Sequence, residues 1–309
     1  MRLTLFDPNS YKFTKDMMEH WQKNHEFETN VYYNPRLVKW ADTVWFDTCD
    51  NNLHQATQET IAGETAESVK LKDKHVICRV IDIEAWCGQQ KGVNWEYVDD
   101  VIFLAPHIKE LVERDIDFNK TDTRVHVIPC GVNTDKFNFR EKPNEHKIAW
   151  VAHRWHAKGV DLVLQLALKL KGTDFRIYAV GPWAIEPWFK AYVDYFIDQN
   201  QLDNMEFIEQ VPDMNEWLDN MDYALCASKK ETFSYAIAEG MSKGLKPLIH
   251  NFYGADKIWD KKYIWNSIDE CVEMLKGEFN PKEYRDYIEQ NYSLKKMLKR
   301  FDEDIFNRK

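Results

Sequence analysis

Residues 227–244 read Ala227-Ser-Lys-Lys-Glu231-Thr-Phe-Ser-Tyr-Ala-Ile-Ala-Glu239-Gly-Met-Ser-Lys-Gly244 and follow the apolar run Tyr223-Ala-Leu-Cys. The apolar run is short and ends at a polar segment, so it predicts a buried strand. Within the stretch, apolar side chains recur every fourth residue, at Phe233, Ile237 and Met241. This spacing places them on one face of a helix, and the stretch therefore predicts a strand, a loop and then a helix.

Two carboxylates flank the start of this predicted helix. If the helix begins near Ser234, Glu231 lies in the loop before it and Glu239 lies in its second turn. The N–H groups of the first turn have no partner within the helix and favour an anion. A phosphate on these groups, with one carboxylate near a sugar and the other near a ribose, is the arrangement that a sugar-nucleotide enzyme needs. The same residues also fit a capping box, Ser228-Lys-Lys-Glu231, in which Glu231 only ties down helix N–H groups and Glu239 is a solvated charge.

The composition is that of a folded, acidic protein. The chain has 309 residues, enough for two domains, and 44% of them are hydrophobic and 30% charged. Because the net charge is −10, nucleic acid is not the first expectation as a partner. Six scattered cysteines without a CxxC pair indicate thiols in a reducing compartment.

The expected location is the cytoplasm. The N-terminal residues become polar too early for a signal peptide, and no apolar run has the length of a transmembrane segment. His153 and His156 form a pair without further His or Cys nearby, so no metal site is expected.

Strand and helix patterns alternate through both halves of the chain. Apolar strands separated by helices predict parallel sheets covered on both faces, so the expected fold class is α/β with two Rossmann-like βαβ domains. The charged, proline-containing segment 140–146 is the expected linker. The expected strands are 3–6, 27–33, 43–46, 75–81, 100–104, 125–128, 148–152, 175–180, 205–208, 223–227 and 246–250. The expected helices are 14–24, 51–58, 108–114, 160–170, 186–199, 215–220, 267–276, 281–290 and 293–306.

Several strand ends of the second half should converge on one site, because parallel sheets bind ligands beyond the carboxyl ends of their strands. Arg154 and Lys158 leave a strand and enter a helix, where cations meet a diphosphate that the helix N-terminus also attracts. Gly159 allows the backbone to approach closely. A basic pair at the start of a helix is often only a solvated surface feature. Here Arg154 and Lys158 follow a strand of the same predicted sheet as Glu231 and Glu239, which favours a role in binding phosphate. The converging segments are 152–159, 180–182, 209–211 and 228–239.

A series of short motifs runs through residues 129–260. Its members are Pro129, Gly131, Val132, Phe137, Lys158, Gly159, Val180, Gly181, Phe207, Ser228, Glu231, Phe233, Glu239, Met241, Gly244 and Gly254. In order and interval they resemble the nucleotide-binding domain of retaining GT-B glycosyltransferases of family 4, whose pattern includes Glu-x7-Glu followed by Gly-x-Pro. The combination is specific, although no single piece is.

The resemblance implies a role for each matching residue of a donor site. The implied catalytic residues are Glu231, which meets the donor sugar, and Lys158 with Arg154, which hold the diphosphate. His153, rather than Arg154, stands at the family's arginine spacing from Lys158. The other implied donor-binding residues are Glu239 on the ribose, Gln210 and Val211 near the base, and Gly159, His153, Gly181, Phe233 and Ser234. The resemblance implies no metal and no cofactor besides the donor substrate, because cations and a helix start replace the metal ion.

The first half matches the family less closely. Asp7-Pro-Asn-Ser10 stands where relatives have a Gly-rich loop, and Ile81 stands where they have a His. Charged residues near strand ends are therefore the candidates for receiving the acceptor proton or binding acceptor hydroxyls, although each alone also fits a turn or a cap. These acceptor-side candidates are Asp47, Asp50, Arg79, Asp82 and Glu84.

The resemblance also implies a domain plan and a function. Residues 1–137 form an acceptor-binding domain and 138–290 a nucleotide-sugar-binding domain across a central cleft, and 291–309 form a helix that packs back on the first domain. The implied reaction is metal-independent, retaining transfer of a sugar from a nucleotide-diphosphate donor to a hydroxyl of a glycan, a lipid-linked or another acceptor. The alternatives are transfer to hydroxymethylated bases of DNA, non-catalytic nucleotide-sugar binding, and a GT-B sugar-nucleotide epimerase.

Overall fold

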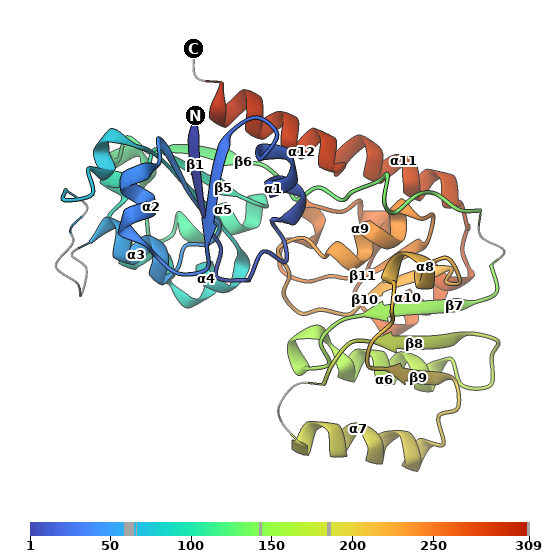
Figure 1. Ribbon diagram of the computed structural model, residues 1–309. Coiled ribbons are helices and arrows are strands. Elements are labelled where there is room, and N and C mark those ends of the chain that lie inside the picture. Colours follow the sequence, from blue (N-terminus) through green and yellow to red (C-terminus); the bar gives the residue numbers. More distant parts are fainter. Residues whose placement is uncertain (59–64, 66, 142–143, 184–186, 308–309) are drawn as a thin grey trace. The chain divides into compact units, whose positions relative to one another are not determined.

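The computed structural model describes residues 1–58, 65, 67–141, 144–183 and 187–307. The chain forms two compact units. Unit 1 comprises Met1–Cys130 and Met297–Lys309, and unit 2 comprises Gly131–Lys296. Each unit contains a six-stranded parallel sheet with helices (Figure 1), which confirms the predicted α/β fold class.

The sheet of unit 1 has the strand order β2-β1-β3-β4-β5-β6. Every residue of β3 and β5 is buried, as expected for a parallel sheet covered on both faces. The strands are β1 (Arg2–Phe6), β2 (Glu26–Asn30), β3 (Thr43–Phe46), β4 (His75–Val80), β5 (Asp100–Phe103) and β6 (Arg124–Val127). The α-helices within Met1–Cys130 are α1 (Lys15–Trp21), α2 (Pro35–Trp40), α3 (Asn51–Thr57), α4 (Asp82–Cys87) and α5 (Pro106–Val112).

The end of the chain completes the core of unit 1. After α12 (Leu294–Arg300), the segment Phe301–Phe306 is a π-helix. Phe301 is fully buried, and its ring centroid lies 5.1 Å from that of Trp45 and 6.3 Å from that of Trp21. The C-terminal segment therefore supplies an aromatic side chain to a core whose strands all lie in the first part of the chain.

Phe301→Ala is expected to lower the free energy of unfolding of unit 1 by about 3–5 kcal/mol, the usual cost of deleting a buried aromatic ring. Denaturant unfolding followed by tryptophan fluorescence measures this loss, because Trp21 and Trp45 lie beside the deleted ring. Phe13→Ala is the matched control, since Phe13 is 44% exposed. Equal effects of the two substitutions would show that the C-terminal segment adds nothing to this core.

The sheet of unit 2 has the strand order β12-β11-β10-β7-β8-β9. The chain runs from β7 outward through β8 and β9, then crosses to β10 and runs outward in the other direction. The strands are β7 (Lys147–Val151), β8 (Arg176–Val180), β9 (Met205–Ile208), β10 (Tyr223–Cys226), β11 (Lys246–His250) and β12 (Ile264–Trp265). The α-helices are α6 (Val160–Lys169), α7 (Pro187–Asn200), α8 (Met214–Leu218), α9 (Tyr235–Ser242), α10 (Ile268–Lys276) and α11 (Pro281–Asn291), followed by the first residues of α12.

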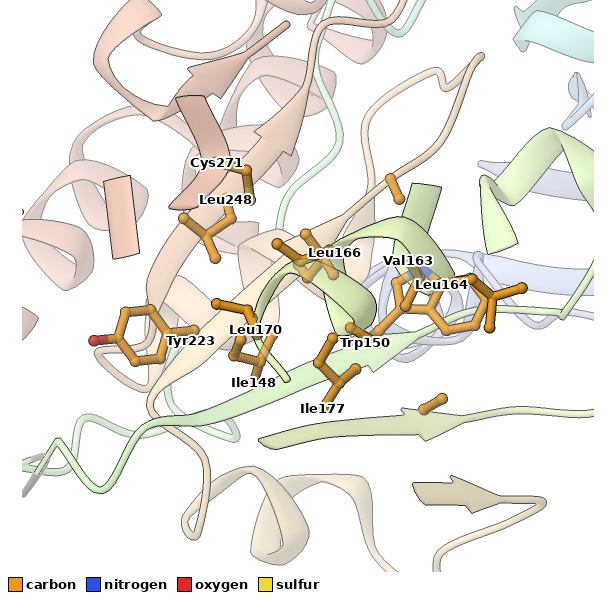
Figure 2. Packing of buried hydrophobic residues seen from close by; sticks show 14 of the residues in the cluster. Ile148, Trp150, Val163, Leu164, Leu166, Leu170, Ile177, Tyr223, Leu248 and Cys271 are labelled. Atoms are coloured by element: carbon orange, nitrogen blue, oxygen red, sulfur yellow. The ribbon is translucent and has the colours of Figure 1, made fainter. Parts of the chain in front are cut away.

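The main core of unit 2 lies between α6 and the sheet. Figure 2 shows Val163 and Leu166 of α6 in the same cluster as Trp150 of β7 and Ile177 of β8. Cys271 of α10 belongs to this cluster too, and α10 packs against α6. The buried side chains of α6 fix the helix on the sheet, and with it the turn that leads from β7 into the helix.

Some elements differ from the sequence-based expectation. The helices α2 and α4 are not predicted, since each has only six residues and no full apolar period. The compact units divide at Gly131, and Arg140 of the expected linker donates its N–H to the Lys243 carbonyl within unit 2. Residues 142 and 143 of that linker and residue 186 at the start of an expected helix lie outside the described residues.

No helix in the described part of the chain is long and apolar enough to cross a bilayer. All six cysteines are free thiols, and only Cys87 is exposed. Between the described side chains of His, Cys, Asp and Glu, no group of three or more is placed to hold a metal ion.

Candidate active site

The strand order of unit 2 reverses between β7 and β10, and the loops that follow these two strands meet at the carboxyl edge of the sheet. Lys158 ends a 3₁₀ turn after β7, and Glu231 lies in the loop after β10. The Lys158 Nζ atom is 2.5 Å from Glu231 Oε1, and the two side chains are 29% and 15% exposed. The structure thus brings together two residues that are 73 positions apart in the sequence, at the kind of edge where parallel sheets bind ligands.

A glycine allows these loops to pack closely. Gly159 has a φ of +75°, and a Cβ atom at this position would lie 1.9 Å from the Ala227 carbonyl oxygen. A backbone hydrogen bond also joins the two loops: the N–H of Lys229, after β10, donates to the carbonyl of Ala157, after β7, at 2.9 Å. Only glycine tolerates both the left-handed backbone conformation and the close approach of the Ala227 carbonyl. Gly159 therefore allows the close backbone packing that the sequence predicts at this position.

The helix after Glu231 begins where the sequence predicts. Ser234 is the N-cap of α9, with a φ of 72° and no capping hydrogen bond from its side chain. Glu239 is the fifth residue of α9 and is partly exposed. The capping-box interpretation is wrong, because the Ser228 hydroxyl donates to Glu231 Oε1 at 2.8 Å and α9 starts only at Tyr235.

Arg154 points into the protein. Its guanidinium is fully buried, donates from Nη2 to the Ala179 carbonyl at 2.9 Å, and also donates to the Ile208 carbonyl. It stacks between Trp183 and Phe207, with Cζ 5.0 Å and 4.9 Å from the ring centroids. Burial lowers the pKa of Arg154 from its usual value. Arg154 therefore ties β8 and β9 together, while its exposed neighbour His153 lies at the surface of the same loop.

The other donor-side candidates lie around the same edge of the sheet. Gly181 has a φ of +138°, and a Cβ atom there would lie 2.2 Å from the Ala152 carbonyl oxygen. Gln210 and Val211 follow β9, with Gln210 exposed and Val211 partly exposed. Phe233 is 2% exposed and its ring lies 5.3 Å from that of Trp259, so it anchors the loop before α9.

The acceptor-side candidates of unit 1 take part in local structure. Asp47 and Arg79 form a buried ion pair with Oδ1 and Nη1 2.9 Å apart. Burial raises the pKa of Asp47 to about 7, although Arg79 opposes the shift. Asp50 accepts from Asn52 N at the start of α3, and Asp82 is the first residue of α4.

Glu84 is also buried within unit 1. It accepts hydrogen bonds from the N–H groups of Ile81 at 3.0 Å and Cys49 at 3.3 Å. Burial raises the pKa of Glu84 well above its usual range. Like Asp47 and Arg79, it holds the ends of neighbouring strands together.

Two residues that support Glu231 are not predicted as site residues, although one of them, Ser228, belongs to the motif series. Ser228 donates to the Glu231 carboxylate, and His250 Nδ1 lies 2.9 Å from the Ser228 carbonyl oxygen. The Ser-x-x-Glu spacing includes the Ser228–Glu231 pair, but as a capping box it predicts that the serine hydroxyl bonds a backbone N–H group and not the glutamate. Nothing in the sequence near His250 signals its contact with a loop 22 residues away.

The family profile described as "Glycosyl transferases group 1" matches residues 132–308, more than half of the chain. No match is found among curated proteins. Solved structures with a similar fold include HepE of Anabaena in complex with UDP, at 13% identity and a TM-score of 0.77, covering 99% of this chain and 100% of HepE. A glycosyltransferase from Rickettsia africae has 15% identity and a TM-score of 0.69, covering 100% of this chain and 99% of its own.

A third similar structure is the lipopolysaccharide outer core galactosyltransferase WaaB, at 13% identity and a TM-score of 0.69, with 99% of both chains covered. HepE has also been solved with UDP-glucose. These structures share the GT-B fold with this chain, which agrees with the two parallel sheets described above. The chain belongs to the group 1 glycosyl transferases and is a glycosyltransferase of the GT-B type.

Proposed function

We propose that this protein transfers a sugar from a UDP-sugar to an acceptor hydroxyl, with retention of anomeric configuration and without a metal ion, as family 4 enzymes do. The observation that carries the proposal is the Lys158–Glu231 ion pair at the reversal of strand order in unit 2. The first turn of α9 begins four residues after Glu231, so a cation, a carboxylate and the N-terminus of a helix share one place.

Lys158 and the start of α9 supply the positive charge that a diphosphate needs. Lys158 pairs with Glu231 in the structure, and a bound diphosphate competes for the same ammonium group. Arg154 supports this site from within the sheet, because its guanidinium bonds the carbonyls of Ala179 and Ile208. His153, an exposed residue of the same loop, is the proposed second basic group at the diphosphate.

The two carboxylates recognise the sugars of the donor. Glu231 faces the transferred sugar and Glu239, one turn into α9, binds the ribose hydroxyls. Gln210 and Val211 follow β9 and meet the base. Uracil is the proposed base, and the UDP and UDP-glucose complexes of HepE support this choice.

During transfer the bond between the anomeric carbon and the diphosphate oxygen breaks, the acceptor oxygen forms a new bond to that carbon, and the proton of the acceptor hydroxyl passes to the departing diphosphate. Negative charge develops on the departing diphosphate, where Lys158 and the α9 N–H groups stabilise it. A glycan or lipid-linked hydroxyl is the proposed acceptor, because the net charge of −10 disfavours DNA.

The test is incubation of the protein with UDP-, GDP- and ADP-sugars in the presence of a chelator, followed by proton NMR. Slow hydrolysis of a UDP-sugar that first releases the same anomer as the donor supports the proposal. A strict need for a divalent cation contradicts the metal-independent mechanism, and release of the opposite anomer contradicts retention. Binding without any turnover would favour a non-catalytic nucleotide-sugar binder.

Glu239→Ala is expected to weaken UDP binding by about 10-fold or more, because two ribose hydroxyls lose a charged acceptor. Isothermal titration calorimetry measures the dissociation constants. Glu273→Ala is the matched control, since Glu273 is a 72% exposed side chain on α10 that pairs with Lys276. Unchanged UDP affinity in folded Glu239→Ala protein would remove Glu239 from the ribose site.

A further inference from the structure

The Glu231 carboxylate receives two hydrogen bonds on the same oxygen. Lys158 Nζ lies 2.5 Å from Oε1 and the Ser228 hydroxyl lies 2.8 Å from it. Lysine is a mobile cation on a flexible stem, whereas a serine hydroxyl is held by its backbone. A negatively charged ligand can therefore draw the lysine away from Glu231, whereas the serine hydroxyl stays in place.

The backbone of Ser228 is fixed from two sides. Its carbonyl oxygen lies 2.9 Å from Nδ1 of His250, at the end of β11. The following N–H, of Lys229, donates to the Ala157 carbonyl in the turn after β7. Ser228 itself is only 3% exposed. The hydroxyl is thus presented to Glu231 from a segment that is bonded to the elements on both sides of it.

A capping role does not explain this serine. The helix that follows begins at Tyr235 with Ser234 as its N-cap, so neither Ser228 nor Glu231 lies in a position to cap it. The hydroxyl donates to a carboxylate that is 15% exposed at the candidate active site. Because the buried Ser228 hydroxyl donates to this partly exposed carboxylate, it restricts the direction in which Glu231 can point.

We propose that Ser228 is a positioning residue, which holds the Glu231 carboxylate toward the donor sugar once the diphosphate has drawn Lys158 away. This inference rests on the proposed function. A diphosphate repels the carboxylate and attracts the ammonium group, so binding of the donor weakens the ion pair that orients Glu231. The Ser228 hydroxyl keeps its hydrogen bond in the presence of the phosphates, because its backbone segment is held by the contacts to His250 and Ala157 and its short side chain cannot follow the ligand.

The test compares Ser228→Ala with Ser228→Thr, which keeps a hydroxyl at the same position. Ser228→Ala is expected to lower kcat for a UDP-sugar by about 10- to 100-fold, the range for losing one hydrogen bond to a charged group. The dissociation constant for UDP, measured by calorimetry, is expected to stay within about threefold, because UDP lacks the sugar that Glu231 meets. Ser228→Thr is expected to recover most of the lost kcat.

A double-mutant cycle separates positioning from a merely structural role. In a Glu231→Ala background, Ser228→Ala is expected to cause no further loss of kcat or of UDP-sugar affinity, since the residue acts through Glu231. Full additivity of the two substitutions, or a Thr variant as impaired as the Ala variant, overturns the proposal. Thermal unfolding of each variant shows whether a loss of activity reflects a loss of folded protein.

The two hypotheses fail in different ways. Wild-type protein that binds neither UDP nor a UDP-sugar overturns the proposed function and the role of Ser228 with it. Wild-type protein that transfers the sugar, together with Ser228→Ala protein of unchanged kcat, overturns the role of Ser228 alone. A loss of kcat that Thr restores supports both.

Discussion

Lys158→Ala is expected to lower kcat/KM for a UDP-sugar by about 10²–10³-fold, the loss typical of removing one group that stabilises developing charge. The ammonium group lies 2.5 Å from Glu231 Oε1, at the edge where the strand order reverses, and it meets the departing diphosphate in the proposed mechanism. The assay measures the release of UDP from a UDP-sugar in the absence of an acceptor. Because Lys158 meets the diphosphate both in the bound donor and in departing UDP, UDP affinity and kcat should both fall.

Lys229→Ala is the matched control for this substitution. Lys229 lies in the same loop as Glu231, but its Nζ pairs with Asp161 at 2.8 Å and its side chain is 44% exposed. An exposed ion pair of this kind contributes little to stability, so the control protein should retain most of its activity. Equal losses of kcat/KM in Lys158→Ala and Lys229→Ala protein would mean that activity depends on the net charge of this region and not on the ammonium group of Lys158.

Gly159→Ala is expected to lower the free energy of unfolding of unit 2 by about 2–4 kcal/mol and to abolish transfer. The methyl group would lie 1.9 Å from the Ala227 carbonyl oxygen, which is main chain and part of the loop after β10. That loop must therefore move away from the turn after β7. The movement separates Lys158 from Glu231, so activity falls even in molecules that remain folded.

Gly172→Ala isolates the backbone part of this effect. Gly172 has a φ of +80°, close to that of Gly159, but a Cβ atom there meets no atom within 4 Å. We expect this control to lose only about 1 kcal/mol of stability and to keep its activity. Chemical denaturation and the UDP-release assay on both proteins give the comparison. If both glycines tolerate alanine equally, the close packing of the two loops is not required.

The sequence predicts the position of the site in unit 2 because local and periodic signals agree there. The apolar run of β10 and the four-residue spacing in α9 place Glu231 in a loop and Glu239 in a helix, as the structure has them. Short strands separated by helices predict the parallel sheet, and the carboxyl edge of such a sheet is shared by its loops. These patterns depend on backbone periodicity, which a single sequence displays.

The direction of individual side chains could not be predicted in this way. Arg154 follows β7 as expected, but its loop pairs with Trp183 and turns the guanidinium inward between two aromatic rings. Spacing from Lys158 contains no information about that pairing. In unit 1, Asp47 directly follows β3 and Arg79 lies in β4, two strands that meet only in the folded sheet, so their ion pair could not be seen in the sequence.

Whether Lys158 binds the diphosphate in place of a metal ion is measured by calorimetric titration of UDP into wild-type and Lys158→Ala protein, both in excess chelator. Wild-type protein is expected to bind UDP without a metal ion, and Lys158→Ala protein is expected to bind it at least about 10-fold more weakly while unfolding at a similar temperature. Wild-type protein that binds UDP only when a divalent cation is restored, or Lys158→Ala protein that binds it as tightly as wild type, would overturn the proposed role of Lys158.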